Sequence, residues 1–170
     1  MKRHILMLAV VAAMLLSATV VSAGELARPG RFGLGGAMGW PGIGLSTNTF
    51  VSQGVSIQAA AYGFWSFNGF AVDVDCLFWL HTIVRHRAFD FTWYAGPGAA
   101  FAYWGGVGLG RYGGTRGGML GGAIKGSAGL ALQFKDAPVD LTWQLSPGVF
   151  VSQYGAGLWL TSMLASRFYF

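Results

Sequence analysis

The stretch from Val139 to Val151, which reads VDLTWQLSPGVFV, alternates apolar and polar side chains along most of its length. Its odd-numbered positions are apolar throughout, whereas its even-numbered positions begin with Asp140, Thr142 and Gln144. Successive side chains of a β-strand point to opposite faces, so this period of two predicts a strand between two different environments. The sequence must then indicate whether the apolar face contacts a protein core or lipid.

The start of the chain carries the features of an export signal. Residues 1–23 read MKRHILMLAVVAAMLLSATVVSA, with basic Lys2 and Arg3 near the start and an apolar run to about Leu16. They end in small residues at Ala23, which is typical of a signal-peptidase cleavage site. We expect a signal peptide over residues 1–23 with cleavage after Ala23, and an uncleaved membrane anchor is the alternative. Without Lys2 and Arg3, nine scattered basic residues remain against six acidic ones, which does not suggest nucleic acid as a partner.

The rest of the chain stays apolar without containing a helix-length apolar span. Hydrophobic residues make up 54% of the sequence and charged residues only 10%, whereas about a quarter of an average soluble domain is charged. After Ala23, glycine or charge interrupts every stretch long enough for a transmembrane helix. The other architecture that spans a bilayer is the closed β-barrel, whose signature is a series of alternating segments of about 10 residues.

Eight such segments follow one another, with turn signals between them. They cover residues 31–40, 43–50, 55–65, 70–84, 91–103, 124–134, 139–151 and 158–170, and the first two are the weakest. We therefore predict an all-β fold, an eight-stranded antiparallel up-and-down transmembrane β-barrel over residues 31–170, after an N-terminal lead over 24–30. Pro97 and Pro147 each remove a ladder amide, so we expect a bulge or a position near the rim at both.

The lengths of the connections predict an orientation. With both termini in the periplasm, the long Gly-rich fifth connection, residues 105–118, is extracellular and the short turn from Lys135 to Pro138 is periplasmic. We expect Arg111, Tyr112 and Arg116 of that connection to contact anionic surface sugars or a partner. The chain ends on Phe170 in SRFYF, which resembles the C-terminal signal read by the barrel-assembly machinery of the outer membrane.

Charged residues fall on the polar face of several segments. Asp73 and Asp75 share one face with His81, and Lys125, Asp140 and Arg167 occupy the same kind of face elsewhere. Side chains fill the interior of an eight-stranded barrel, and charges placed there must be paired. We therefore predict a lumenal ionic network in which Asp73 and Asp75 meet Lys125 or Arg167, in preference to a pair of catalytic carboxylates.

The last third of the chain resembles a known group of proteins. The run KDAPVDLTWQLSPGVFV and the ending SRFYF are similar to a family of small exported bacterial outer-membrane barrels of unknown function. The matching residues are Asp136, Ala137, Pro138, Val139, Asp140, Pro147 and Phe170. GIGLS, at Gly42 to Ser46, also resembles the first hairpin of that family. The resemblance implies an outer-membrane barrel with the outer-membrane bilayer as its surroundings, and it implies no activity.

Motifs for catalysis or cofactor binding are weak. GLGRYG, at residues 108–113, matches G-x-G-x-x-G, but the following GTRGGMLGG does not start a helix that would hold a pyrophosphate. A metal site at His81 and His86 lacks an evident third ligand. No His-x-Ser pair, which a lipid esterase would need, follows residue 23. Cys76 is the single cysteine, so it has no disulfide partner in the chain. We expect neither enzymatic activity nor a cofactor.

Three functional interpretations remain open. The first is a barrel with a filled lumen and a structural or surface-recognition role through its outer loops. The second is a narrow permeation or transport barrel, with room for water beside small lumenal residues, namely Gly96, Gly98, Ala100, Gly129 and Ala131. The third is a soluble, exported, lipocalin-like barrel that binds a ligand in an apolar interior.

Overall fold

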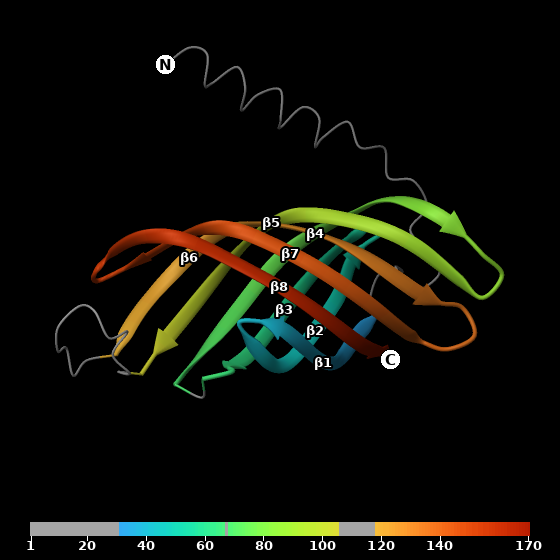
Figure 1. The fold of residues 1–170 in the computed structure, drawn as a ribbon. Helices are drawn as coiled ribbons and strands as arrows, with labels where there is room; N and C mark the ends of the chain where they lie inside the picture. Colours follow the sequence, from blue (N-terminus) through green and yellow to red (C-terminus); the bar gives the residue numbers. More distant parts are fainter. Residues whose placement is uncertain (1–30, 67, 106–117) are drawn as a thin grey trace, which may run out of the picture.

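The computed structural model describes residues 31–66, 68–105 and 118–170, which form one closed antiparallel barrel (Figure 1). Its strands are β1 (Phe32–Trp40), β2 (Gly42–Ser52), β3 (Val55–Phe64), β4 (Gly69–Arg85), β5 (Phe89–Trp104), β6 (Met119–Phe134), β7 (Val139–Ser152) and β8 (Gly155–Tyr169). Each strand pairs with the next, and β8 pairs with β1 to close the ring. The prediction of an all-β, eight-stranded, antiparallel up-and-down barrel is confirmed.

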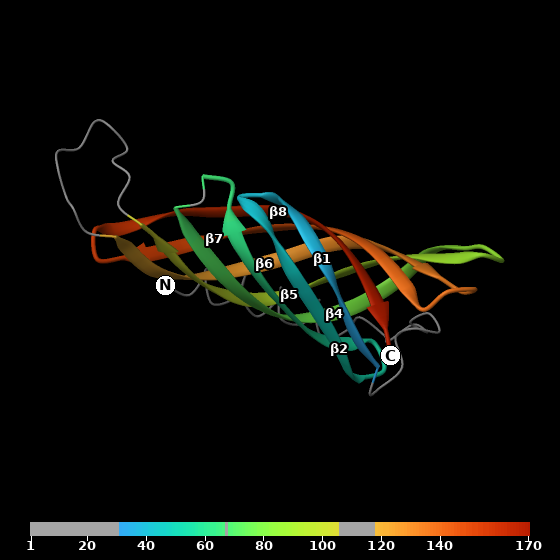
Figure 2. The ribbon, with the colours of Figure 1, turned by 90° about the horizontal axis from the view of Figure 1, so that it is seen from below.

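The two ends of the barrel differ in their connections. The end that carries Phe170 also carries the β2–β3, β4–β5 and β6–β7 turns, and we call it the terminal end (Figures 1 and 2). The β1–β2, β3–β4 and β7–β8 turns and the β5–β6 connection lie at the other end, which we call the distal end. Strands β1 to β3 contain 9, 11 and 10 residues, whereas β4 to β8 contain 14 to 17. The wall is therefore taller on the side of β4 to β8.

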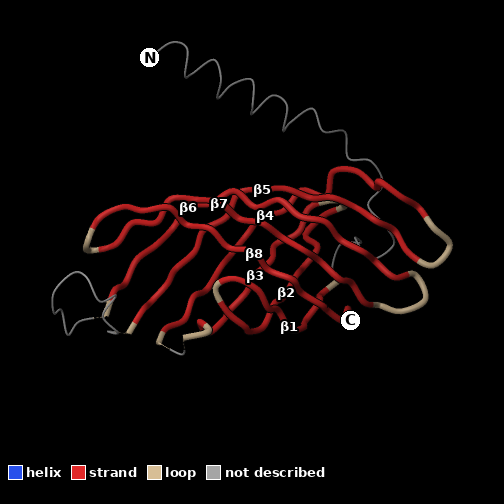
Figure 3. Tube along the Cα trace, in the orientation of Figure 1, coloured by secondary structure: helices blue, strands red, loops and turns tan. Residues whose placement is uncertain are grey.

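Most connections at both ends are short, so nearly all of the described chain is strand (Figure 3). At the β2–β3 turn Gly54 has a φ of 76°, a left-handed conformation that a residue without Cβ adopts without strain. The β6–β7 turn is closed by the amide of Val139, which donates to the carbonyl of Ala137 at 2.7 Å. Tight turns between neighbours produce the up-and-down order of the strands.

Some details of the strands differ from the prediction. Strand β6 begins at Met119 and not at residue 124. The sequence pattern missed its first residues because Gly121 and Gly122 have no side chains that could produce an alternation. His81 is exposed and does not face the lumen, since the β4–β5 register shifts between Trp79 and His81. The registers have no shift at Pro97 or Pro147, although Pro97 has no pair on β4 and Pro147 has none on β6. Both prolines also lie well inside their strands, so the expectation of a bulge or a position near the rim was wrong.

The alternation in the sequence separates the two sides of the barrel wall. On β7 the outward side chains Leu141, Trp143 and Leu145 are 39%, 49% and 40% exposed, whereas inward Asp140 and Thr142 are 0% and 3% exposed. The other strands repeat this pattern, with large apolar side chains outward and most polar or charged side chains inward. Aromatic side chains occur on both faces, which the sequence pattern did not predict.

Candidate functional site: the filled lumen

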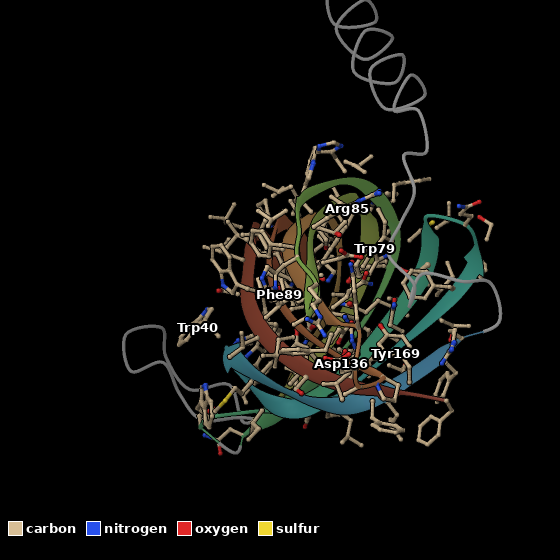
Figure 4. All side chains as sticks on the ribbon, turned by 90° about the vertical axis from the view of Figure 1, so that its right-hand side faces the viewer. Trp40, Trp79, Arg85, Phe89, Asp136 and Tyr169 are labelled. Carbon is tan, nitrogen blue, oxygen red and sulfur yellow. The ribbon has the colours of Figure 1, made fainter. Side chains whose placement is uncertain are left out.

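The interior of the barrel has three layers along its axis. Aromatic rings fill the distal end, polar and charged side chains fill the middle, and a second aromatic group fills the terminal end. Figure 4 looks into the barrel from the terminal end, where buried Trp79 and Tyr169 lie inside the ring and exposed Trp40 lies outside it. The middle layer contains the charged residues and is therefore the candidate site.

The first ion cluster in the middle layer centres on Lys125 of β6. Its Nζ lies 2.8 Å from Oδ2 of Asp73 and 3.1 Å from the carboxylate of Asp75, both on β4. Tyr62 donates its hydroxyl to Asp73 at 3.2 Å, and Ser127 donates to Asp75 at 2.9 Å. One cation thus faces two carboxylates, and neutral donors provide the remaining hydrogen bonds.

A glycine on the intervening strand makes this cluster possible. Strand β5 lies between β4 and β6, and its Gly98 pairs with both Asp75 and Lys125 in the two registers. A Cβ at Gly98 would overlap Oδ1 of Asp75. The space left by the missing side chain is therefore occupied by a carboxylate of the neighbouring strand, which reaches across β5 toward Lys125.

The second ion cluster centres on Arg167 of β8. Its Nε and Nη2 donate to the two carboxylate oxygens of Asp140 on β7, at 3.1 and 2.9 Å, which is a bidentate pair. Tyr169 donates its hydroxyl to the same carboxylate at 2.7 Å and accepts from Asn48 at 3.0 Å. Both charged side chains are fully buried. Here one cation faces one carboxylate.

Two glutamines join the clusters across the lumen. Gln58 of β3 accepts from Nη1 of Arg167 at 2.6 Å and donates to Oε1 of Gln144 at 2.8 Å. Gln144 of β7 in turn donates to Oδ2 of Asp75 at 3.1 Å. The middle layer is therefore one connected hydrogen-bond network that includes opposite walls of the barrel.

The distal aromatic layer closes the lumen above this network. Trp104 stacks on Phe64 with a centroid distance of 4.9 Å and meets the edge of Phe150 at 5.1 Å. Trp159 stacks on Phe150 at 5.4 Å. Offset and edge-to-face rings pack as densely as other core side chains, so the layer blocks the axis.

The terminal aromatic layer has the same role at the other end. Trp79 lies 5.1 Å from both Phe50 and Tyr94, and Phe50 lies 6.1 Å from Tyr169, measured between ring centroids. The indole of Trp79 donates to Ser56 at 2.9 Å, so its polar edge is satisfied inside the barrel. Both ends of the polar layer are therefore covered by aromatic rings.

A small cavity remains between the clusters. Its volume is about 10 Å³, and Asp73, Asp75, Gln58, Gln144 and Ser46 contribute polar atoms to its wall. This volume is room for roughly one water molecule. The hydroxyl of Ser46 faces the cavity and has no hydrogen-bond partner among the described residues. The middle layer is therefore packed almost completely.

The structure brings together the residues that the sequence singled out. Asp73 and Asp75 both contact Lys125, as one of the two predicted alternatives has it, whereas Arg167 contacts Asp140 and is connected to Asp75 through the two glutamines. Gln144 lies on the polar face that the alternation in the sequence predicts, and Gln58 follows the same alternation on its own strand. Their bridging role depends on which strands face each other across the ring, which alternation does not encode.

The other predicted positions have different outcomes. The small residues considered for a water path do not leave open space, since a Cβ at Gly96 would overlap a β4 carbonyl and one at Gly129 would meet the ring of Tyr94. Arg111, Tyr112, Arg116 and the GLGRYG motif lie outside the described residues, as does the cleavage site after Ala23.

The described residues contain no candidate metal site, and the comparisons with known proteins found no relative. Within residues 31–66, 68–105 and 118–170, no three His, Cys, Asp or Glu side chains are grouped to hold a metal ion. The same part of the chain contains no helix that is long and apolar enough to span a membrane. No family model, curated protein or solved structure matches this chain.

Proposed function

We propose that this protein is an integral outer-membrane β-barrel with a side-chain-filled lumen, which has a structural or surface-recognition role. The observation that carries the proposal is the distribution of side chains across the wall. Large apolar side chains lie on the outward face of every strand, whereas Asp73, Asp75, Lys125, Asp140 and Arg167 lie inside. A soluble barrel of the lipocalin type needs the reverse arrangement.

Lipid surroundings explain this distribution energetically. Soluble monomers rarely expose contiguous apolar patches larger than a few hundred Å². In a bilayer the same apolar side chains contact apolar acyl chains. A closed barrel also leaves no strand edge with unpaired amides in the lipid. A transmembrane strand needs about 9 to 11 residues, which even the short strands β1 to β3 provide.

The two ends of the sequence support an outer-membrane location. Residues 1–23 have the pattern of a signal peptide, with cleavage expected after Ala23. At the other end Phe168 and Phe170 point outward, 47% and 70% exposed, with ring centroids 5.2 Å apart. An outward aromatic pair on the last strand is accessible to the assembly machinery that we propose as a partner.

Cell fractionation combined with gel mobility tests the proposal. We expect the protein in the outer-membrane fraction after alkaline extraction, with a mobility that changes on boiling because the closed barrel resists detergent until heated. Recovery as soluble periplasmic material would contradict a membrane location. A mobility that does not depend on boiling would contradict a stable closed barrel in detergent.

A pair of outward substitutions tests lipid contact directly. Leu145 lies in the middle of β7, so Leu145→Arg should cost about 2–4 kcal/mol of unfolding free energy in a bilayer. Val84→Arg, next to the end of β4, should cost about 0–1 kcal/mol because it lies near the interface. Equal costs in vesicles, measured by urea unfolding, would contradict a membrane-embedded wall.

The filled lumen favours a structural or recognition role over permeation. Two aromatic layers and the ion clusters occupy the lumen, and the central cavity between the clusters has a volume of about 10 Å³. We expect no stable conductance in planar bilayers, and a steady single-channel current would contradict the proposal.

The recognition role predicts that alanine at Arg111, Tyr112 and Arg116 reduces binding of cells to anionic sugars. Unchanged binding would exclude those three residues.

A further inference from the structure

The exposed charges of the described residues are not spread over the barrel. Those that lie outside the lumen are all at the terminal end: Arg85, Arg87, Lys135 and Asp136 are exposed, and Arg31 is partly exposed. Figure 4 shows this end toward the viewer, with Arg85, Phe89 and Asp136 labelled. Four basic residues and one acidic residue therefore form a rim around one mouth of the barrel, which we call the basic rim.

Hydrogen bonds hold two of the turns in this rim together. Nζ of Lys135 lies 2.9 Å from Oδ1 of Asp90 and donates to the carbonyl of His86 at 3.0 Å. The amide of Lys135 also donates to the carbonyl of Ala88 at 3.0 Å. The β4–β5 turn, which carries His86 and Arg87, is thus fixed against the β6–β7 turn. Arg85 and Arg87 are both exposed beside this pair of turns.

The basic rim directly borders the apolar outer surface. On β4, Ile83 and Val84 are 50% and 46% exposed, and the next residue is Arg85. An apolar surface that ends abruptly in cationic side chains matches the boundary between acyl chains and phosphate groups in a bilayer. Guanidinium groups bind phosphate oxygens with two parallel hydrogen bonds, which suits them to this position.

We infer that the basic rim binds the phosphate groups of anionic phospholipids in the leaflet at the terminal end. This inference rests on the proposed membrane location and adds the lipid class and the residues that recognise it. Arg85 and Arg87, which follow the apolar surface of β4, are the principal contacts, and the exposed carboxylate of Asp136 weakens the attraction.

Lipid selectivity of the reconstituted protein tests the inference. The full-length mature chain is refolded into vesicles of phosphatidylcholine, and association of spin-labelled phosphatidylglycerol is compared with that of spin-labelled phosphatidylcholine by electron paramagnetic resonance. We expect a preference for phosphatidylglycerol that falls about fivefold for each arginine removed in Arg85→Gln and Arg87→Gln. Asp136→Asn should raise the preference.

Matched double variants distinguish an effect of the basic rim on lipid preference from an effect of the net charge of the protein. Ser66→Asp combined with Tyr154→Asp lowers the net charge by the same two units at exposed turn positions of the distal end, so it should leave the preference unchanged. Equal losses in both double variants would overturn the rim as the binding site. A folded, inserted protein without preference for phosphatidylglycerol would overturn the inference alone, whereas failure to insert into any vesicle would overturn the membrane location as well.

Discussion

The two ion clusters of the lumen neutralise buried carboxylates with different numbers of carboxylates for each cation. Arg167 and Asp140 form a one-to-one bidentate pair, whereas Lys125 serves both Asp73 and Asp75. A guanidinium has a planar set of donors that matches one carboxylate, and an ammonium is a compact charge that can face several acceptors. The comparison shows that the identity of the cation follows the number of carboxylates around it.

The clusters also differ in the neutral donors that support them. The carboxylate of Asp140 receives a tyrosine hydroxyl in addition to the guanidinium, whereas Asp75 receives a serine hydroxyl and an amide as well as the ammonium. Counted over a whole cluster, the carboxylates around Lys125 receive three hydrogen bonds from neutral side chains (Tyr62, Ser127 and Gln144), whereas Asp140 receives one, from Tyr169. The Lys125 cluster therefore depends more on its surroundings, and removal of its cation leaves two carboxylates unpaired.

Removal of each cation should give the largest effect. Lys125→Met should lower the unfolding free energy by about 4–5 kcal/mol and Arg167→Met by about 3–4 kcal/mol, since breaking a buried pair costs about 3–5 kcal/mol. Urea unfolding of the refolded barrel in detergent measures both. The neutral variant Lys125→Met/Asp73→Asn/Asp75→Asn should recover most of the loss. A larger cost for Arg167→Met would mean that bidentate geometry outweighs the number of carboxylates.

Exchange of the cation type should give the next largest effect. Arg167→Lys keeps the charge but loses the bidentate bond to Asp140 and the bond to Gln58, so we expect a loss of about 2–3 kcal/mol by the same unfolding measurement. If Arg167→Lys is as stable as the wild type, the planar donor set has no energetic role in this cluster.

Gly98 on β5 and Gly126 on β6 form a matched pair of glycines near the Lys125 cluster. Gly98→Ala should cost about 2 kcal/mol because its Cβ would displace the pinned carboxylate of Asp75. Gly126→Ala, whose Cβ would meet nothing within 4 Å, should change stability by less than about 0.5 kcal/mol. Similar unfolding midpoints for the two variants would show that Asp75 can move at no cost.

The two tyrosines that donate to the clusters should give the smallest effects. Tyr169→Phe removes a 2.7 Å bond to Asp140 and the partner of Asn48, whereas Tyr62→Phe removes a 3.2 Å bond to Asp73. We expect losses of about 1.5–2 kcal/mol and about 1 kcal/mol. The opposite order in urea unfolding would mean that the Lys125 cluster depends on Tyr62 more than the geometry indicates.

Local periodicity predicts much of this fold and only part of its interior. Alternation on β7 predicted which side of Val139–Ser152 faces inward, because a period of two is a property of the strand itself. It failed at His81, where a bulge shifts the register, and at Gly121 and Gly122, which have no side chain to alternate.

The ion pairing needed information that no single strand contains. The sequence marked Arg167 as lumenal, but it named only Asp73 and Asp75 as carboxylates that Arg167 or Lys125 would meet. The structure selects Asp140 because β7 and β8 are neighbours and the two residues face each other in register. The aromatic rings of Trp79 and Trp159 were harder to predict, because large apolar side chains suit both lipid and a packed lumen.

The alternation of carboxylates and aliphatic groups on β4 also constrains how the strands align. Asp73 and Asp75 alternate with Val72, Val74 and Cys76 along the same strand. Sliding β4 by one residue against its neighbours would turn both carboxylates outward and leave Lys125 without a counter-ion. Misaligned intermediates are therefore penalised by unpaired charge on both sides of the wall. The bonds from Gln58 to Gln144 and to Arg167 join residues 86 and 109 positions apart, so they form only when the ring has closed in the correct register.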